Sequence, residues 1–117
     1  MNPMTTLIIE NFDTADLLCH TAAHRTGMQP DKFSAEICDC IDSVLQLLGS
    51  KPTTAGFDNA YYNVTKAVVD YDQKPDLEGI GKIGKELDRY RTEALARAAT
   101  TPSSLTVRRQ NTARTIE

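Results

Sequence analysis

The chain has 117 residues, of which 40% are hydrophobic and 25% charged, the size and composition of one globular domain. No window approaches the roughly 18 consecutive apolar residues of a membrane span, and the first residues lack the basic stretch of a secretory signal, so we expect a cytoplasmic protein without membrane partners. The formal charge of -3 combines an acidic part, residues 1–72 with ten acidic and four basic side chains, and a basic part, residues 73–117 with six acidic and nine basic side chains.

The first predicted element is a short strand over residues 5–10, because this segment is rich in β-branched residues. The pattern then becomes helical, and a first helix is predicted over residues 13–26. Small side chains such as Ala15 and Ala22 fall on one arc of this helix. Gly27 supplies a residue that commonly ends a helix.

The clearest helix is predicted over residues 30–48. Pro30 and Asp31 suit the first turn of a helix, and Gly49 follows its end. Apolar side chains cover about half of its helical wheel, as expected of a helix that packs on a core. They are Phe33, Ile37, Cys40, Ile41, Val44, Leu45, Leu47 and Leu48.

A third helix is predicted between a cap at Thr53 or Thr54 and Pro75. Its β-branched content makes a strand the alternative, but apolar residues recur at spacings of three and four, which favours a helix. The shared face consists of Phe57, Ala60, Tyr61, Val64, Ala67, Val68 and Tyr71.

The last helix is predicted over residues 76–99 or 82–99. Its inward positions are Ile80, Ile83, Leu87, Tyr90, Ala94 and Ala98. On the other face, Arg89, Glu93 and Arg97 follow one another at intervals of four residues, which predicts an exposed ladder of ion pairs.

The predicted fold class is an all-α bundle of about four helices in a single domain, residues 1–99, with short β segments at one or both termini. The remaining residues, 100–117, form a polar, basic tail. Apolar and polar residues alternate over residues 104–109, so this segment could pair with the strand at 5–10 or stay unpaired. A two-stranded ribbon is only marginally stable in water, so pairing between two copies would add strands and predicts a homodimer.

Few side chains suggest catalysis or metal binding. His20 and His24 share a helix face one turn after Asp16, as metal ligands would, but a third ligand is missing. Cys38 and Cys40 diverge by about 200° on a helix and are interpreted as small buried hydrophobic residues. An odd number of cysteines argues against a disulfide framework. We therefore predict reduced thiols, no metal, no cofactor and no enzymatic activity.

The glycine-rich string over residues 79–85 fits two phosphate-binding patterns incompletely. With the spacing of a Walker A loop, Glu86 stands where Ser or Thr should bind magnesium. As a Gly-x-Gly-x-x-Gly loop it lacks the hydrophobic strand that should come before it. Neither pattern therefore predicts nucleotide binding.

Residues 77–82 resemble the hairpin of a helix-hairpin-helix motif, in which a Gly-hydrophobic-Gly turn directs backbone amides at one DNA phosphate. Over about residues 32–95 the chain is similar to the small amino-terminal domain of family X DNA polymerases. This resemblance implies a non-specific DNA-binding module whose contacts would be Gly79, Gly81, Lys82 and Lys85. The lyase lysine of that family falls at Glu86 or Leu87 here, so lyase activity is not implied.

The leading interpretation is a small non-catalytic protein that binds a larger protein and regulates or inhibits it, as bacterial or phage inhibitors and anti-activators do. Tyr62 and Val69 lie away from the core face of their helix, and Leu17 lies opposite the small side chains of the first helix. These three residues are the candidates for an exposed apolar contact surface. Non-specific DNA binding is the alternative.

Overall fold

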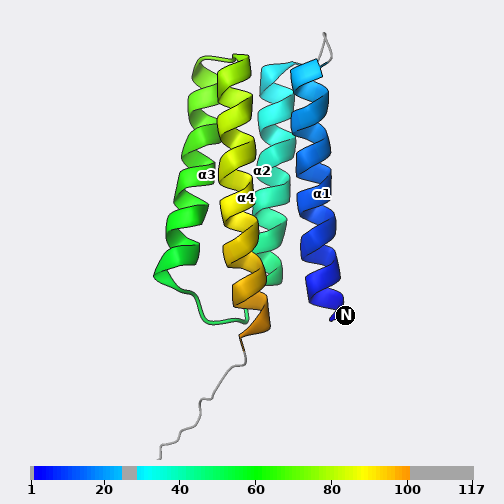
Figure 1. Ribbon diagram of the computed structural model, residues 1–117, viewed down its shortest axis with the longest axis vertical. Helices are drawn as coiled ribbons and strands as arrows, with labels where there is room; N and C mark the ends of the chain where they lie inside the picture. Colours follow the sequence, from blue (N-terminus) through cyan, green and yellow to red (C-terminus); the bar gives the residue numbers. More distant parts are fainter. Residues whose placement is uncertain (1, 25–28, 101–117) are drawn as a thin grey trace, which may run out of the picture.

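Four α-helices follow one another in the computed structural model, which describes residues 2–24 and 29–100 (Figure 1). The helices are α1 (Pro3–His24), α2 (Pro30–Leu47), α3 (Ala55–Gln73) and α4 (Leu77–Ala99). Each runs antiparallel to the one before, and the predicted all-α bundle is confirmed. Within the described ranges no helix combines the length and apolar character that a membrane crossing requires.

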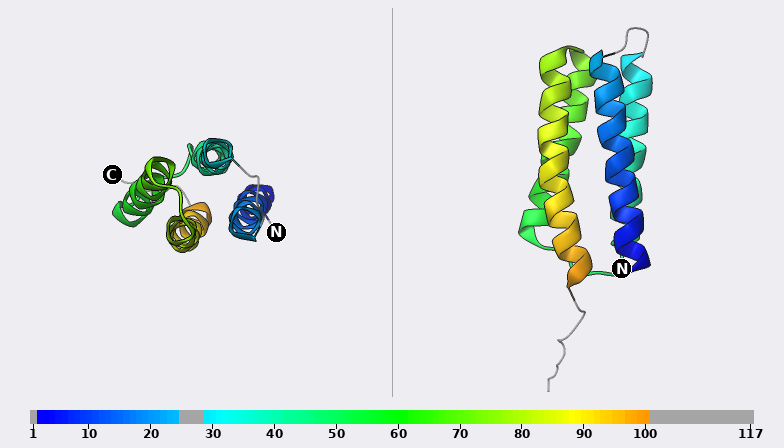
Figure 2. Two further views of the ribbon diagram at one scale, coloured as in Figure 1. Left: turned by 90° about the horizontal axis from the view of Figure 1, so that it is seen from above. Right: turned by 45° about the vertical axis from the view of Figure 1, so that its right-hand side comes forward.

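The helices pack as a four-membered ring. α1 packs against α2 and α4, and α3 packs against the same two neighbours, so α1 and α3 occupy opposite corners (Figure 2). Of these four contacts between neighbouring helices, that between α3 and α4 is the most extensive and that between α2 and α3 the least extensive. The outer faces of α1 and α3 therefore belong to different sides of the molecule.

Side-chain caps fix the starts of α3 and α4. The hydroxyl of Thr54 accepts a hydrogen bond from the backbone amide of Phe57 at 3.1 Å, so Thr54 rather than Thr53 is the cap. The carboxylate of Asp76 accepts from the amide of Gly79 at 2.7 Å. Such caps satisfy amides that have no partner within the helix.

The predicted strand at residues 5–10 is wrong, because this segment belongs to α1. Ile8, Phe12 and Ala15 recur at helical spacing and are buried in the bundle. The apolar area they bury outweighs the weak β preference of the segment. α1 therefore begins ten residues earlier than predicted. The second predicted strand, at residues 104–109, lies outside the described residues.

Tyr90 of α4 joins all four helices at the centre of the core. Its side chain is fully buried, and its ring lies 5.5 Å from that of Phe12 in α1 and 5.3 Å from that of Phe57 in α3, measured between centroids. Its hydroxyl donates to the backbone carbonyl of Ile41 in α2 at 3.0 Å. The burial of this polar group is thus compensated by a hydrogen bond.

The exposed ladder of ion pairs predicted on α4 is wrong, because among the described residues Arg89 pairs with Glu86 at 3.9 Å and Glu93 pairs with neither arginine. Arg97 is only 7% exposed, and its guanidinium donates to the backbone carbonyls of Pro52 at 3.1 Å and Lys51 at 2.7 Å. The connection between α2 and α3 passes the end of α4 and presents these carbonyls, which an arginine fork can reach in pairs. Arg97 consequently ties this connection to α4 instead of pairing with Glu93.

Candidate functional site

The three apolar residues expected at the surface are exposed, but they do not lie together. Leu17 is 65% exposed, Tyr62 64% and Val69 49%. Tyr62 and Val69 lie seven residues apart on one face of α3, whereas Leu17 belongs to α1 at the opposite corner of the bundle. The candidate surface on α3 therefore consists of Tyr62 and Val69 without Leu17.

A first cavity lies beside the Tyr62 side chain. Its volume is about 320 Å³, and every residue that lines it comes from α3. These residues are Tyr61, Tyr62, Thr65, Lys66 and Val69. We call this space the Tyr62 cavity.

A second cavity, of about 370 Å³, lies between α2 and α3. The α2 residues that line it are Asp31, Ser34, Ala35 and Cys38, and the α3 residues are Val68, Val69, Asp72 and Gln73. Val69 lines both cavities, so they adjoin. The α2–α3 groove denotes the two cavities together.

The α2 side of the groove was not found by sequence reasoning. Asp31, Ala35, Cys38 and Asp42 form a stripe along α2 at spacings of four, three and four residues. The sequence places Asp31 in the first turn of the helix and favours a small buried residue at Cys38, and it predicts no role for Ala35 or Asp42. The stripe becomes a candidate site only once it is known that this flank of α2 meets α3.

Acidic side chains dominate the charge of the groove. Burial raises the pKa of the Cys38 thiol, and the carboxylates of Asp42, Asp39 and Asp72 raise it further. Asp42 also accepts a hydrogen bond from the Tyr61 hydroxyl at 3.3 Å, which links α2 to α3. Several carboxylates thus act on the middle of the groove.

The cation and the serine of the groove differ in their hydrogen bonding. The ammonium of Lys66 pairs with the carboxylate of Asp70 at 2.9 Å, so its charge is already matched. The hydroxyl of Ser34 is buried and has no hydrogen-bond partner among the described residues. A buried hydroxyl without a hydrogen bond costs free energy. Among the described residues that line the second cavity, Ser34 is the one whose polar side-chain atom is buried without a partner.

The predicted hairpin turn at residues 77–82 is not formed, because these residues are the first turns of α4. The Asp76 cap places the start of the helix at Leu77, ahead of Gly79 and Gly81. Their amides are therefore arranged along a helix instead of around a turn that could receive a phosphate. DNA binding itself remains a prediction.

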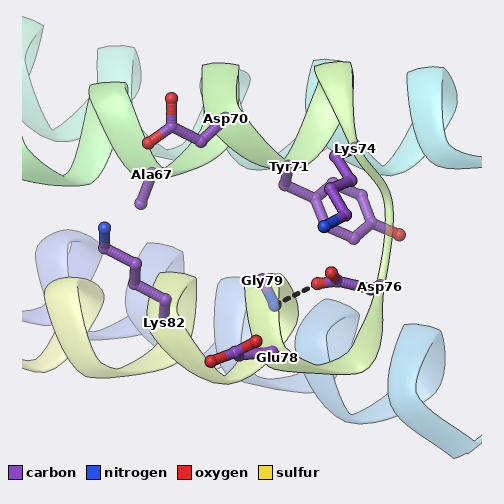
Figure 3. Close-up of a pocket in the computed structure, with 8 residues that line it drawn as sticks. All are labelled: Ala67, Asp70, Tyr71, Lys74, Asp76, Glu78, Gly79 and Lys82. Atoms are coloured by element: carbon purple, nitrogen blue, oxygen red, sulfur yellow. Dashed lines mark hydrogen bonds between the residues drawn. The ribbon is translucent and has the colours of Figure 1, made fainter.

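Gly79 and Lys82 line a further pocket, of about 310 Å³, between the end of α3 and the start of α4 (Figure 3). Lys82 extends from α4 towards α3, and Lys74 is the other cation of the pocket. The acidic residues that share it are Asp70, Asp76 and Glu78. Three carboxylates against two ammonium groups make this pocket unfavourable for phosphate.

The histidines and cysteines form no multidentate site in the described structure. The rings of His20 and His24 lie 4.5 Å apart, centroid to centroid, but no group of three or more metal-binding side chains occurs within residues 2–24 and 29–100. Burial raises the pKa of Cys19 to about 12 and also raises that of Cys40, which is buried. These thiols are protonated at neutral pH and are weak nucleophiles.

Comparison of the chain with protein-family models, curated proteins and solved structures finds no match in any of the three. The function proposed below is argued from the geometry and chemistry of the chain itself.

Proposed function

We propose that this protein acts without catalysis, by binding a larger protein through α3 and so regulating or inhibiting it. The observation that carries the proposal is the pair Tyr62 and Val69, exposed on one face of α3 and both lining the Tyr62 cavity. Single exposed apolar residues are common on any protein surface. An exposed tyrosine beside an aliphatic residue and a cavity is typical of the centre of a protein interface.

The chemistry of the remaining side chains supports binding over catalysis. The pKa of each of the three cysteines is raised, which disfavours the nucleophilic thiolate. His20 and His24 are exposed on α1, and their rings are tilted by 46° to each other. Among the described residues Cys38 lines the α2–α3 groove beside Asp31 and Asp72, but no histidine lines the groove with it to form the thiol–imidazole pair of a nucleophilic cysteine.

Photo-crosslinking in the cells that encode the protein tests the proposal. A benzoylphenylalanine would replace Tyr62, Val69, Leu17 or, as a control on the exposed face of α4, Asp88. We expect a discrete, stoichiometric protein adduct from Tyr62 and Val69 and none from Asp88. Recovery of nucleic acid, or of no protein from any position, would overturn the proposal, and nucleic acid would favour the DNA-binding alternative.

Homodimer formation remains a prediction. The argument from strand pairing no longer supports it, because residues 5–10 are helical and cannot provide an edge strand. What still supports it is charge, since the acidic part of one copy can meet basic residues of α4 such as Lys82, Lys85 and Arg89 in another. Sedimentation of the full chain at micromolar concentration is expected to show a dimer that dissociates as salt is raised. A monomer at low salt and high concentration would contradict the prediction.

A further inference from the structure

We infer that the α2–α3 groove binds a basic, amphipathic helical segment of the partner protein. This inference rests on the proposed function and adds the location of the contact and the chemistry of what fills it. Three features of the groove carry it: its length, its apolar middle and its acidic margins.

The groove is long enough to hold a short helix. It extends along α3 from Tyr61 to Gln73, thirteen residues whose twelve rises give about 18 Å, which is the length of a helix of about twelve residues. Its second cavity lies at the contact between α2 and α3, the least extensive of the four contacts between neighbouring helices. Helix-in-groove recognition uses apolar anchors at positions i, i+3, i+4 and i+7.

The middle of the groove is apolar and its margins are acidic. Val69 and Tyr62 provide exposed apolar surface and Val68 lines the space from the buried core, while Asp31 and Asp72 line the same space. Lys66, its cation, is matched by Asp70 at 2.9 Å. A segment with leucine-like anchors and flanking lysines or arginines complements this arrangement.

A second copy of the chain is a poorer occupant. A two-fold dimer through this face would bring two acidic margins together, which costs free energy. The basic face of α4, with Lys82, Lys85 and Arg89, lacks large apolar side chains that could fill the groove. The carboxy-terminal tail contains Arg108 and Arg109, so the experiment includes it as a competing occupant.

The experiment measures binding of the full-length chain to a fluorescein-labelled, 14-residue leucine/lysine peptide whose leucines recur at helical spacing. We expect Tyr62→Ser with Val69→Ser to weaken binding about tenfold, and Asp31→Asn with Asp72→Asn to weaken it about fivefold at low salt but not at high salt. The matched control, Glu10→Gln with Asp13→Asn, removes two exposed charges from α1 and should change affinity less than twofold. Amide chemical shifts should move at Ala35, Cys38 and Thr65.

Four outcomes would overturn the inference. The first is an equal loss of affinity in the α1 control, and the second is equal binding of a peptide with the same composition but no apolar face. The third is that the peptide binds more tightly to the double variant Arg108→Gln with Arg109→Gln but not to the double variant Lys82→Gln with Lys85→Gln. The carboxy-terminal tail would then be the occupant of the groove. The fourth is a dimer that the Asp31 and Asp72 variants dissociate, which would assign it to a second copy.

The peptide experiment and the crosslinking experiment fail separately. If Tyr62 and Val69 capture a protein in cells while the peptide does not bind the groove, the proposed function stands and this inference falls. If the peptide binds as expected and no protein is captured in cells, the groove still binds basic amphipathic helices but the proposed function falls.

Discussion

The guanidinium of Arg97 lies 4.5 Å from the centroid of the Phe57 ring, with Phe57 in the first turn of α3 and Arg97 in the last turn of α4. The same guanidinium donates to the carbonyls of Lys51 and Pro52, while the ammonium of Lys51 donates to the carbonyl of Thr100 at 2.9 Å. The start of α3, the end of α4 and the connection from α2 are thus held at one point.

We expect Arg97→Ala to lower the free energy of unfolding by about 2–3 kcal/mol, because it removes two hydrogen bonds from a charged donor and a cation–π contact. Arg97→Lys should recover less than half of this loss, since an ammonium cannot reach both carbonyls as the fork does. Urea denaturation with an unchanged m value is the measurement. Arg89→Ala is the control: Arg89 is exposed and lies 3.9 Å from Glu86, so a loss of similar size there would contradict the argument.

The role of Arg97 also shows where sequence reasoning reaches its limit. The amphipathic pattern correctly predicts α2, α3 and α4, because long helices with a continuous apolar face leave little choice of secondary structure. The partner of Arg97 is a loop forty-five residues away, and no local pattern encodes that contact. The ladder of ion pairs predicted for Arg97 agrees with the residue spacing along the helix, but Arg97 contacts the loop carbonyls instead.

The amino-terminal segment and the candidate site show two further limits. Residues 5–10 carry β-branched side chains, yet their burial in the bundle decides for a helix. Tyr62 and Val69 could be found from α3 alone, because a helical wheel separates them from the core. The contribution of Asp31, Ala35 and Cys38 depends on which flank of α2 meets α3, and the order of helices around the bundle decides that.

We expect Tyr90→Phe to lower the free energy of unfolding by about 1 kcal/mol, because it deletes the hydrogen bond to the Ile41 carbonyl while keeping the buried ring. Tyr90→Leu should cost more, since the ring also contacts Phe12 and Phe57. Thermal and urea unfolding measure both changes. The exposed Tyr62→Phe should be neutral, and equal losses at the two tyrosines would show that the buried hydroxyl has no special role.

Stability is expected to fall as the pH rises above about 8.5. Burial raises the pKa of Cys19 to about 12, whereas a thiol in the unfolded chain ionises near 8.5. Above that value the unfolded chain loses a proton that the folded chain keeps, so deprotonation favours unfolding.

Between pH 7.5 and 10 this effect should cost about 1 kcal/mol for Cys19, after allowance for its partial exposure. Cys19→Ala should flatten the decline by that amount in urea titrations at the two pH values. Alkylation should report the same environment, with Cys19 reacting slowly in the folded chain and rapidly in urea. An unchanged pH dependence in Cys19→Ala would mean that other groups cause the decline.

Gly81→Ala is expected to stabilise the protein by about 0.8–1.0 kcal/mol, because Gly81 lies in the interior of α4 and an added Cβ meets no atom within 4 Å. At Gly79 the same change would place a Cβ 3.0 Å from the Tyr71 ring and 3.1 Å from the capping oxygen of Asp76, so no gain is expected there. In a helix-hairpin-helix turn, by contrast, Gly81 would supply a backbone position that alanine disturbs. Thermal unfolding should show a rise of about 4 °C for Gly81→Ala, and a fall instead would contradict the open, mid-helix position of Gly81.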